Sequence, residues 1–198
     1  YSGPGTTSIF GKKWLLVAID DSKSWIEAFA LKAKSEAGLA LKQYSKYVRK
    51  PIRTRCDNAP EFRGEEGKWQ KAHDELGIIS TNSAQYEPQT NPNAENCVRL
   101  MQNAIRTNLA GVDFRLWCQC AQYYLPHTWN RITKPGKKSP YWHAFRREPE
   151  TKYFRRFGAL CFAKVQVLKR DKEHTSKLAP RYEPAVFLGY NRNSTYGV

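Results

Sequence analysis

Two short strand-like runs, separated by a polar connection of five residues, most constrain what the first part of this chain can fold into. Trp14–Ile19 is uninterruptedly apolar, and Trp25–Leu31 alternates apolar and polar residues. Between them lies the sequence Asp20-Asp21-Ser22-Lys23, whose residue types favour turns. Two runs of this kind joined by a short polar connection predict a β-hairpin.

Segments with helix and strand patterns alternate after this hairpin. Pro51 blocks the continuation of a helix, and Gly77 is typical of the residue that ends one. The predicted segments are helices over Lys34–Val48 and Glu65–Leu76 and strands over Ile52–Cys56 and Ile78–Ser80.

The clearest helix signal begins at Asn91-Pro92, because asparagine is a favoured N-cap and proline suits the first helical position. A polar loop over Thr81–Gln89 precedes it, and an amphipathic, aromatic-rich helix is predicted over Phe114–Trp129. The alternating order predicts an α/β domain, not a helical bundle or a β-sandwich. The buried stripe of the Asn91-Pro92 helix is predicted to be Ala94, Val98, Met101, Ile105 and Leu109.

The sequence changes character after Pro135-Gly136. Gly158–Val167 and Ala185–Tyr190 are strand-like, and a charged segment containing proline separates them. This pattern predicts part of a small β-barrel. We therefore predict an α/β domain over residues 1–145 and a partial β domain over residues 146–198.

The charge of the chain is large and unevenly placed. Its 33 Lys and Arg exceed its 18 Asp and Glu, giving +15. Arg131–Arg181 holds fifteen of the basic residues and four of the acidic ones, a net +11. Such a field attracts polyanions, so a nucleic acid is the expected partner. The alternative interpretation is a basic, solvated surface.

Other classes of protein are disfavoured by what the sequence lacks. Its five cysteines are scattered and lack the spacing of a zinc site, so free thiols in a reducing, intracellular compartment are expected. No stretch approaches 18 apolar residues, so no membrane partner is expected. The cysteines are Cys56, Cys97, Cys118, Cys120 and Cys161.

Two carboxylates stand at positions suited to metal chemistry. Asp57 follows a predicted strand, and Glu95 lies in the first turns of the Asn91-Pro92 helix. Carboxylates on a strand end and a facing helix can share hard divalent cations such as Mg²⁺. Two such ions would serve an in-line displacement at phosphorus. The alternative is that both carboxylates are ordinary surface residues.

One face of the same helix carries polar groups at helical spacing. Glu95, Arg99, Gln102 and Arg106 occur at i, i+4, i+7 and i+11. The helix therefore presents donors for DNA phosphates beside the carboxylate. The alternative is a solvated face on which Glu95 and Arg99 form a weak ion pair.

The residues around both carboxylates carry a resemblance to a known family. The sequences from Asp57 to Phe62 and from Pro88 to Glu95 resemble the Asp-Asn-Gly-x-Glu-Phe and Pro-Gln-x-Asn-Gly-x-Ala-Glu motifs of retroviral and retrotransposon integrase cores, and within them of the copia group. The 37 residues between the two carboxylates are close to the family's spacing. Later copia landmarks are matched by Trp117, Asn130-Arg131, Ser139-Pro140-Tyr141, Phe157-Gly158 and Phe187-Leu188-Gly189-Tyr190.

Some positions depart from the family pattern. Ala59-Pro60 replaces a glycine-containing turn, and Pro92 replaces a glycine; a proline in a mobile catalytic loop can slow its closure. The family's first catalytic Asp precedes a Gly-Pro pair, so it is expected just ahead of Tyr1. Asp20 and Asp21 then fall in the hairpin turn with a structural role, and the chain alone is not expected to carry out strand transfer.

The resemblance implies an RNase H-like α/β integrase core with a truncated first strand, followed by part of an SH3-like β-barrel. It implies a fragment of the Pol polyprotein of a copia-type long-terminal-repeat retrotransposon. The intact protein is expected to process DNA 3′ ends and transfer strands, using two Mg²⁺ or Mn²⁺ ions held by Asp57 and Glu95. Expected partners are element and target DNA and further copies of the chain, in the nucleus or a cytoplasmic virus-like particle. The alternative is a non-catalytic nucleic-acid-binding module from a decayed or domesticated element.

Overall fold

The predicted β-hairpin forms the centre of the molecule. The structure is a computed structural model that describes residues 5–56, 59, 62, 67–82, 92–164 and 181–191. Strands β1 (Trp14–Asp20) and β2 (Trp25–Leu31) pair antiparallel, from Trp14 opposite Leu31 to Asp20 opposite Trp25. The apolar run and the alternating run in the sequence therefore predicted the two strands to within one residue.

The alternation of helices and strands that follows is also confirmed. Strands β3 and β4 pair parallel, with Arg53 opposite Ile79. Gly77 has a φ of +59° and ends α2, as the sequence predicted. The elements are a 3-10 turn η1 (Lys34–Glu36), α1 (Ala37–Tyr47), β3 (Arg53–Cys56), α2 (Lys68–Leu76), β4 (Ile79–Asn82) and α3 (Pro92–Asn108).

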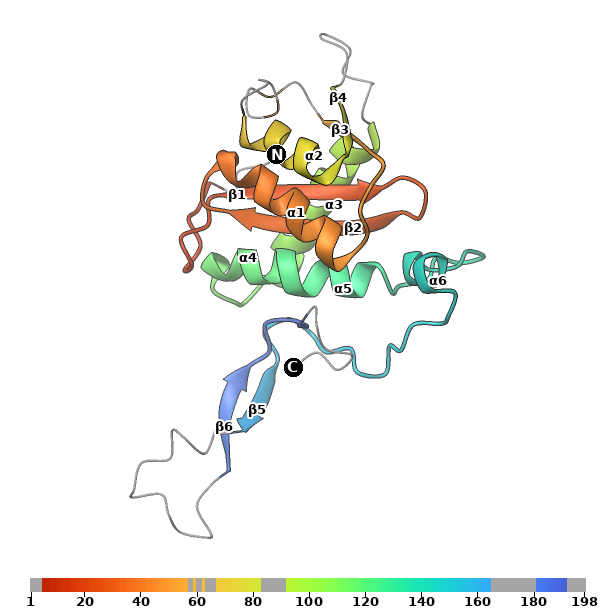
Figure 1. Ribbon diagram of the computed structural model, residues 1–198. Helices are drawn as coiled ribbons and strands as arrows, with labels where there is room; N and C mark the ends of the chain where they lie inside the picture. The colour runs from red at the N-terminus through yellow and green to blue at the C-terminus, as the bar shows by residue number, and fades with distance from the viewer. Residues whose placement is uncertain are drawn as a thin grey trace.

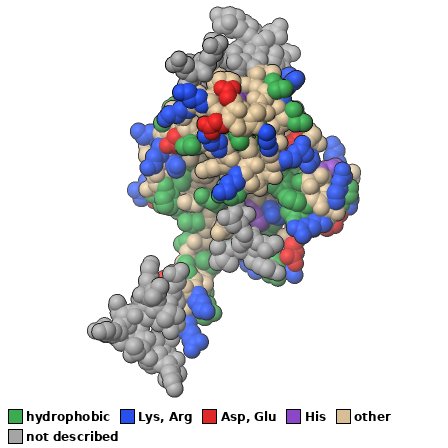
Figure 2. All heavy atoms as spheres, in the orientation of Figure 1, with side chains coloured by type: hydrophobic (Ala, Val, Ile, Leu, Met, Phe, Trp, Pro, Cys, Tyr) green, Lys and Arg blue, Asp and Glu red, His purple; other side chains and the backbone are tan. Residues whose placement is uncertain are grey.

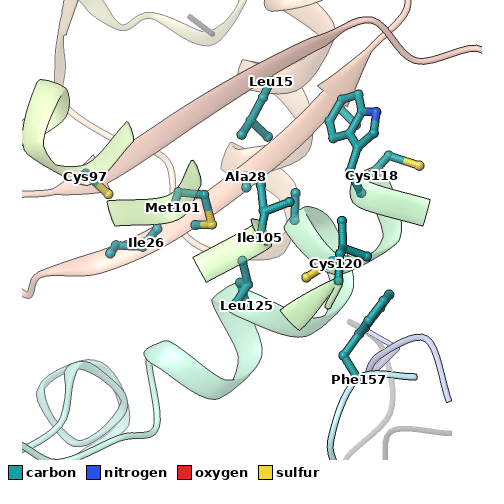
Figure 3. Close-up of a cluster of buried hydrophobic side chains, with 14 residues drawn as sticks. Leu15, Ile26, Ala28, Cys97, Met101, Ile105, Cys118, Cys120, Leu125 and Phe157 are labelled. Atoms are coloured by element: carbon teal, nitrogen blue, oxygen red, sulfur yellow. The ribbon is translucent and has the colours of Figure 1, made fainter. Parts of the chain in front are cut away.

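Helices cover both faces of the β1–β2 hairpin (Figure 1). On one face, Ile26 and Ala28 pack against Met101 and Ile105 of α3 and against Leu125 (Figure 3). On the other face, Phe29 and Leu31 of β2 pack against Ala40 and Tyr44 of α1. All seven residues of β2 are buried. The α/β architecture predicted from the sequence is thus observed as a hairpin between two layers of helices.

The second helix layer is less regular than its periodicity predicts. A continuous helix was expected over Phe114–Trp129, whereas Cys120–Tyr124 forms a π-helical turn in which the N–H of Leu125 bonds to the carbonyl of Cys120. Pro126 explains the difference, because it has no N–H to donate four residues back and its ring would clash there. The segments are a 3-10 turn η4 (Phe114–Leu116), α4 (Trp117–Gln119), the π turn η5 (Cys120–Tyr124) and α5 (Leu125–Trp129).

A short helix, α6 (Pro140–Phe145), follows α5 and was not predicted. Asn130, which is 1% exposed, connects the segment before α6 to strand β2. Its side-chain Oδ1 accepts the N–H of Ile26 at 2.9 Å, and its Nδ2 donates to the Ile26 carbonyl at 2.8 Å. Buried Ser139 caps α6, because its Oγ accepts the N–H of Trp142. Asn130 and Ser139 both belong to the segments that carry the sequence resemblance, and both have structural roles here.

The C-terminal segment packs on the α4–α5 layer through an aromatic cluster formed by Tyr124, His127, Phe157 and Tyr190. Phe157 is fully buried in the main core. The Tyr190 N–H donates to the Tyr123 carbonyl at 2.7 Å, and the Tyr190 ring stacks on His127 at 3.8 Å. Gly189, at a φ of +128°, allows this approach, because a Cβ there would lie 2.7 Å from the Tyr123 backbone.

Strands β5 (Leu160–Lys164) and β6 (Tyr182–Val186) form an antiparallel hairpin beyond this cluster. The strand predicted over Ala185–Tyr190 is displaced, since its last four residues pack on the helices instead. Within residues 146–164 and 181–191, two strands are described and no closed barrel. The predicted division at residue 145 stays a prediction. No helix of the described residues is long and apolar enough to cross a membrane.

We predict that Asn130→Ala lowers the free energy of unfolding by about 3 kcal/mol, because it leaves a buried N–H and a buried carbonyl of Ile26 without partners. Urea unfolding followed by circular dichroism measures this change. Asn96→Ala is the matched control: Asn96 is exposed and accepts a single bond from Arg99. Equal effects of the two substitutions would show that Asn130 does not hold the β2 edge.

The stability of the aromatic cluster should depend on pH through His127. Burial, and secondarily the charge of Arg131, lowers the pKa of His127 from 6.5 to about 3. The unfolded chain then binds a proton that the folded chain excludes. The contribution of neutral His127 to the free energy of unfolding is complete above pH 6.5. It is lost as the pH falls toward the folded-state pKa, by at most about 1.4 kcal/mol per pH unit. His127→Phe should flatten this part of the stability–pH curve, and parallel curves for both proteins would contradict the assignment.

Candidate catalytic and nucleic-acid site

Glu95 lies in the first turn of α3 with its side chain exposed. The opposite side of the helix is buried through Cys97, Met101 and Ile105, so core packing fixes which face of α3 meets solvent. Met101, Ile105 and Leu109 of the predicted stripe are buried, and Ala94 and Val98 are half-buried. The helix therefore holds the Glu95 carboxylate outward, accessible to a cation or a polar substrate.

Asp57, the second predicted ligand, lies outside the described residues. The strand that leads to it is described: β3 ends at buried Cys56. Phe62, the last residue of the Asp57 motif, is 7% exposed and meets the Trp69 ring of α2 edge-on at 4.8 Å. Cys56, before the motif, and Phe62, its last residue, are thus both packed in the core. That the Asp57 and Glu95 carboxylates share a site stays a prediction.

The hairpin turn has the structural role predicted for it. Asp20 Oδ1 accepts the N–H and the hydroxyl of Ser22, which closes the turn. Asp21 Oδ1 accepts a bond at 3.1 Å from Asn93 Nδ2, in the first turn of α3. This contact joins residues far apart in the sequence and was not predicted. It places the turn beside the start of the helix that carries Glu95.

Glu95 is the described residue that the sequence predicts as a metal ligand. No group of three His, Cys, Asp or Glu side chains that could hold a metal ion occurs among the described residues. Glu95 offers an exposed carboxylate, which suits a hard divalent cation such as Mg²⁺ or Mn²⁺. Asp57 is the other ligand that the sequence predicts.

The polar face of α3 carries two exposed arginines held by neighbouring amides. Arg99 donates to Asn96 Oδ1 at 2.8 Å, and Arg106 donates to Asn103 Oδ1 at 3.1 Å. A guanidinium has five N–H donors, so one bond to an amide leaves donors for a phosphate. Gln102 lies between them and is half-buried. The Arg99 bond to Asn96 differs from the Glu95–Arg99 pair that the alternative interpretation expected.

A second basic surface surrounds α6, which lies within the basic segment Arg131–Arg181. We define the α6 surface as Lys138, Trp142, Phe145, Arg146 and Arg147. Lys and Arg side chains are visible over this part of the molecule in Figure 2. The signal available in the sequence was the interleaving of basic and aromatic residues from Lys137 to Arg147.

The fold is that of a retroviral integrase catalytic core, an RNase H-like α/β fold. No protein-family model and no curated protein sequence matches the chain. Among solved structures, the catalytic core domain of BIV integrase matches with a TM-score of 0.54 at 18% identity, over 67% of this chain and 85% of that one.

A larger assembly contains a similar chain. The simian T-cell lymphotropic virus intasome, in complex with the PP2A regulatory subunit B56 gamma, matches with a TM-score of 0.57 at 18% identity. The match covers 87% of this chain and 61% of that one, so this chain spans about three fifths of its length. At such identities the likeness establishes the fold, and the chemistry depends on the residues described above.

We predict that Arg99→Ala and Arg106→Ala each weaken DNA binding and leave the fold intact. Each change in the free energy of unfolding should stay below about 1 kcal/mol, because both side chains are exposed. The slope of log affinity against log salt should become shallower by about 0.9 for each lost phosphate contact. Lys71→Ala is the control, an exposed lysine on α2 in the other helix layer. An unchanged slope in the arginine variants would show that the polar face of α3 contacts solvent and does not bind DNA phosphates.

Proposed function

We propose that this chain is the catalytic-core region of an integrase from the Pol polyprotein of a copia-type long-terminal-repeat retrotransposon. The observation that carries the proposal is the placement of Glu95, exposed in the first turn of α3, within a fold that matches 85% of a retroviral integrase core. Asp57, directly after β3, supplies the second carboxylate. The intact protein trims DNA 3′ ends and joins them to target DNA.

In this proposal Asp57 and Glu95 would hold two Mg²⁺ or Mn²⁺ ions, which would supply activation of the attacking oxygen and stabilisation of the leaving oxygen. The exposed face of α3 positions the substrate: Arg99, Gln102 and Arg106 hold backbone phosphates beside Glu95. The bond between Asn93 and Asp21 fixes the start of the helix. In joining, a DNA 3′-hydroxyl oxygen bonds to a target phosphorus, the target's own 3′ oxygen leaves, and the hydroxyl proton passes to solvent.

The C-terminal hairpin belongs, in this proposal, to a small SH3-like domain. Leu160 and Val186 are directly opposite each other in β5 and β6, so they share a face of the hairpin, and both are more than half exposed. Phe162, two residues along, is exposed on the same face. An apolar face of this kind supports the packing of further barrel strands against it.

Assembly and location follow from the same proposal. The similar chain of the simian T-cell lymphotropic virus belongs to an intasome, which supports action as a homo-oligomer on DNA ends. The protein would work in the nucleus or in a cytoplasmic virus-like particle.

The test is a joining assay with Mg²⁺ or Mn²⁺, using this chain extended upstream by its native residues so that the expected first Asp is present. Asp57→Asn and Glu95→Gln should each abolish joining while DNA affinity is retained, because ligands for both ions are needed. Asp20→Asn is the matched control and should join DNA normally, since Asp20 closes the hairpin turn.

Three outcomes would contradict the proposal or part of it. Normal joining by Glu95→Gln would overturn the catalytic role of Glu95. Loss of joining in Asp20→Asn would make Asp20 the first ligand in place of the upstream residue. DNA binding without joining in the unmodified extended protein would identify a non-catalytic binding module.

A further inference from the structure

Two aromatic rings of α6, and a third further along the chain, each lie beneath a basic side chain. Lys138 and Arg146 lie 5.4 and 5.0 Å from the ring centre of Trp142. Arg131 lies 4.7 Å from the ring centre of Tyr141, and Lys152 lies 4.8 Å from that of Tyr153. From residue 131 to residue 156 the chain has nine Lys and Arg against two Glu, a net +7. This part of the surface therefore suits an anionic ligand that also has flat apolar groups.

The α6 surface is built on a fixed scaffold. The Tyr141 N–H donates to the Asn130 carbonyl at 2.7 Å, and Asn130 is itself bonded to β2. The Phe145 ring meets the Trp25 ring edge-on at 5.7 Å and the Tyr141 ring at 4.8 Å. Phe145 nevertheless remains 54% exposed. One side of this ring is held in place while the rest is open to a ligand.

The α6 surface lies at the same end of the β1–β2 hairpin as Glu95. Trp25, which contacts α6, is paired with Asp20 at the hairpin turn. The next residue, Asp21, accepts the bond from Asn93 at the start of α3, two residues before Glu95. In Figure 1, α6 lies at the right edge, below the β1–β2 turn. A strand that passes Glu95 can therefore continue toward α6.

We propose that the α6 surface binds an unpaired stretch of DNA next to the catalytic end of the fold, a site that rests on the proposed integrase function. A base stacks on Phe145 and Trp142, which are neighbours on the helix at i and i+3. Arg146 and Arg147 hold the phosphates on either side, and Lys138 is paired with Glu148. Stacking of bases on aromatic rings inside a basic groove is how sequence-tolerant single-strand binding works, and it requires bases that are free of their partners.

Charge and ring geometry together favour a polynucleotide over anions that have no bases. A phosphate-rich partner without bases would use the basic residues and gain nothing from Phe145. A base can take the place of Arg146 over Trp142, because the displaced guanidinium can then pair with the adjacent phosphate. The ligand class is thus a polynucleotide with at least one exposed base.

The experiment measures fluorescence anisotropy of three DNAs with the full chain: a blunt duplex, the same duplex with an unpaired tail of four nucleotides, and that duplex with an abasic tail. The unmodified chain should bind the tailed duplex about tenfold more tightly than the other two. Phe145→Leu and Trp142→Leu should lose that preference and keep their affinity for the blunt duplex. Trp142→Tyr should restore it, because the ring is restored.

Two controls separate stacking from structure and charge. Tyr153→Leu removes an aromatic residue that is 46% exposed and also lies under a lysine, but outside α6, and it should keep the preference. Arg146→Ala should weaken the binding of all three DNAs and make the dependence of affinity on salt shallower. Melting temperatures identify any variant that fails to fold, and Trp142→Leu then carries the test if Phe145→Leu does not fold.

Equal affinity of the unmodified chain for blunt, tailed and abasic DNA would overturn the proposal. So would a tail preference that survives both leucine variants, or tighter binding of a tail made of RNA. Glu95→Gln should keep the tail preference even though joining is lost. Failure of the α6 site is therefore distinguishable from failure of the catalytic assignment, which the joining assay alone decides.

Discussion

The complete burial of β2 is the constraint on which the rest of the structure depends. A strand with both faces covered needs apolar contacts above and below it, and α1 and α3 supply them. Its edges also need partners: β1 pairs with one, and the Asn130 amide bonds to the backbone of Ile26. Because the chain must return to satisfy Ile26, it brings α6 beside Trp25. Burial of one strand thus determines where the basic and aromatic residues around α6 are held.

The candidate site joins parts of different origin. The fold, shared with retroviral integrase cores at 18% identity, supplies an exposed helix start. The side chains on that helix determine which ligands it can bind. They are the Glu95 carboxylate and then two guanidinium groups along the same helix, each hydrogen-bonded to an asparagine three residues earlier. An acidic group that suits cations and basic groups that suit phosphates thus lie on one rigid element, which suits chemistry at a phosphodiester.

Local patterns predicted much of the fold, and contacts between distant residues account for what they missed. The hairpin, the end of α2 at Gly77 and the buried side of α3 follow from alternation, a left-handed glycine and helical spacing. Helix α6 is short, and hydrogen bonds to Asn130 and Ser139 hold it in place. A hydrophobic periodicity in the sequence does not reveal such bonds. The apolar residues after Val186 pack on helices instead of continuing β6. At the site, Glu95 was predicted by its motif, whereas its proximity to the hairpin turn depends on a bond between Asp21 and Asn93.

The aromatic cluster around Tyr190 has a consequence for biosynthesis. The ribosome releases the helices that receive Tyr190 well before Tyr190 itself, so Tyr124 and His127 emerge without the rings that later cover them. Until Tyr190 has been synthesised, the nascent protein exposes an apolar surface of the kind that chaperones bind and that promotes aggregation. A translation product that stops before Tyr190 would keep this surface permanently open. Quality control in the cell could therefore distinguish chains synthesised beyond Tyr190 from chains that stop before it, at a position remote from Glu95.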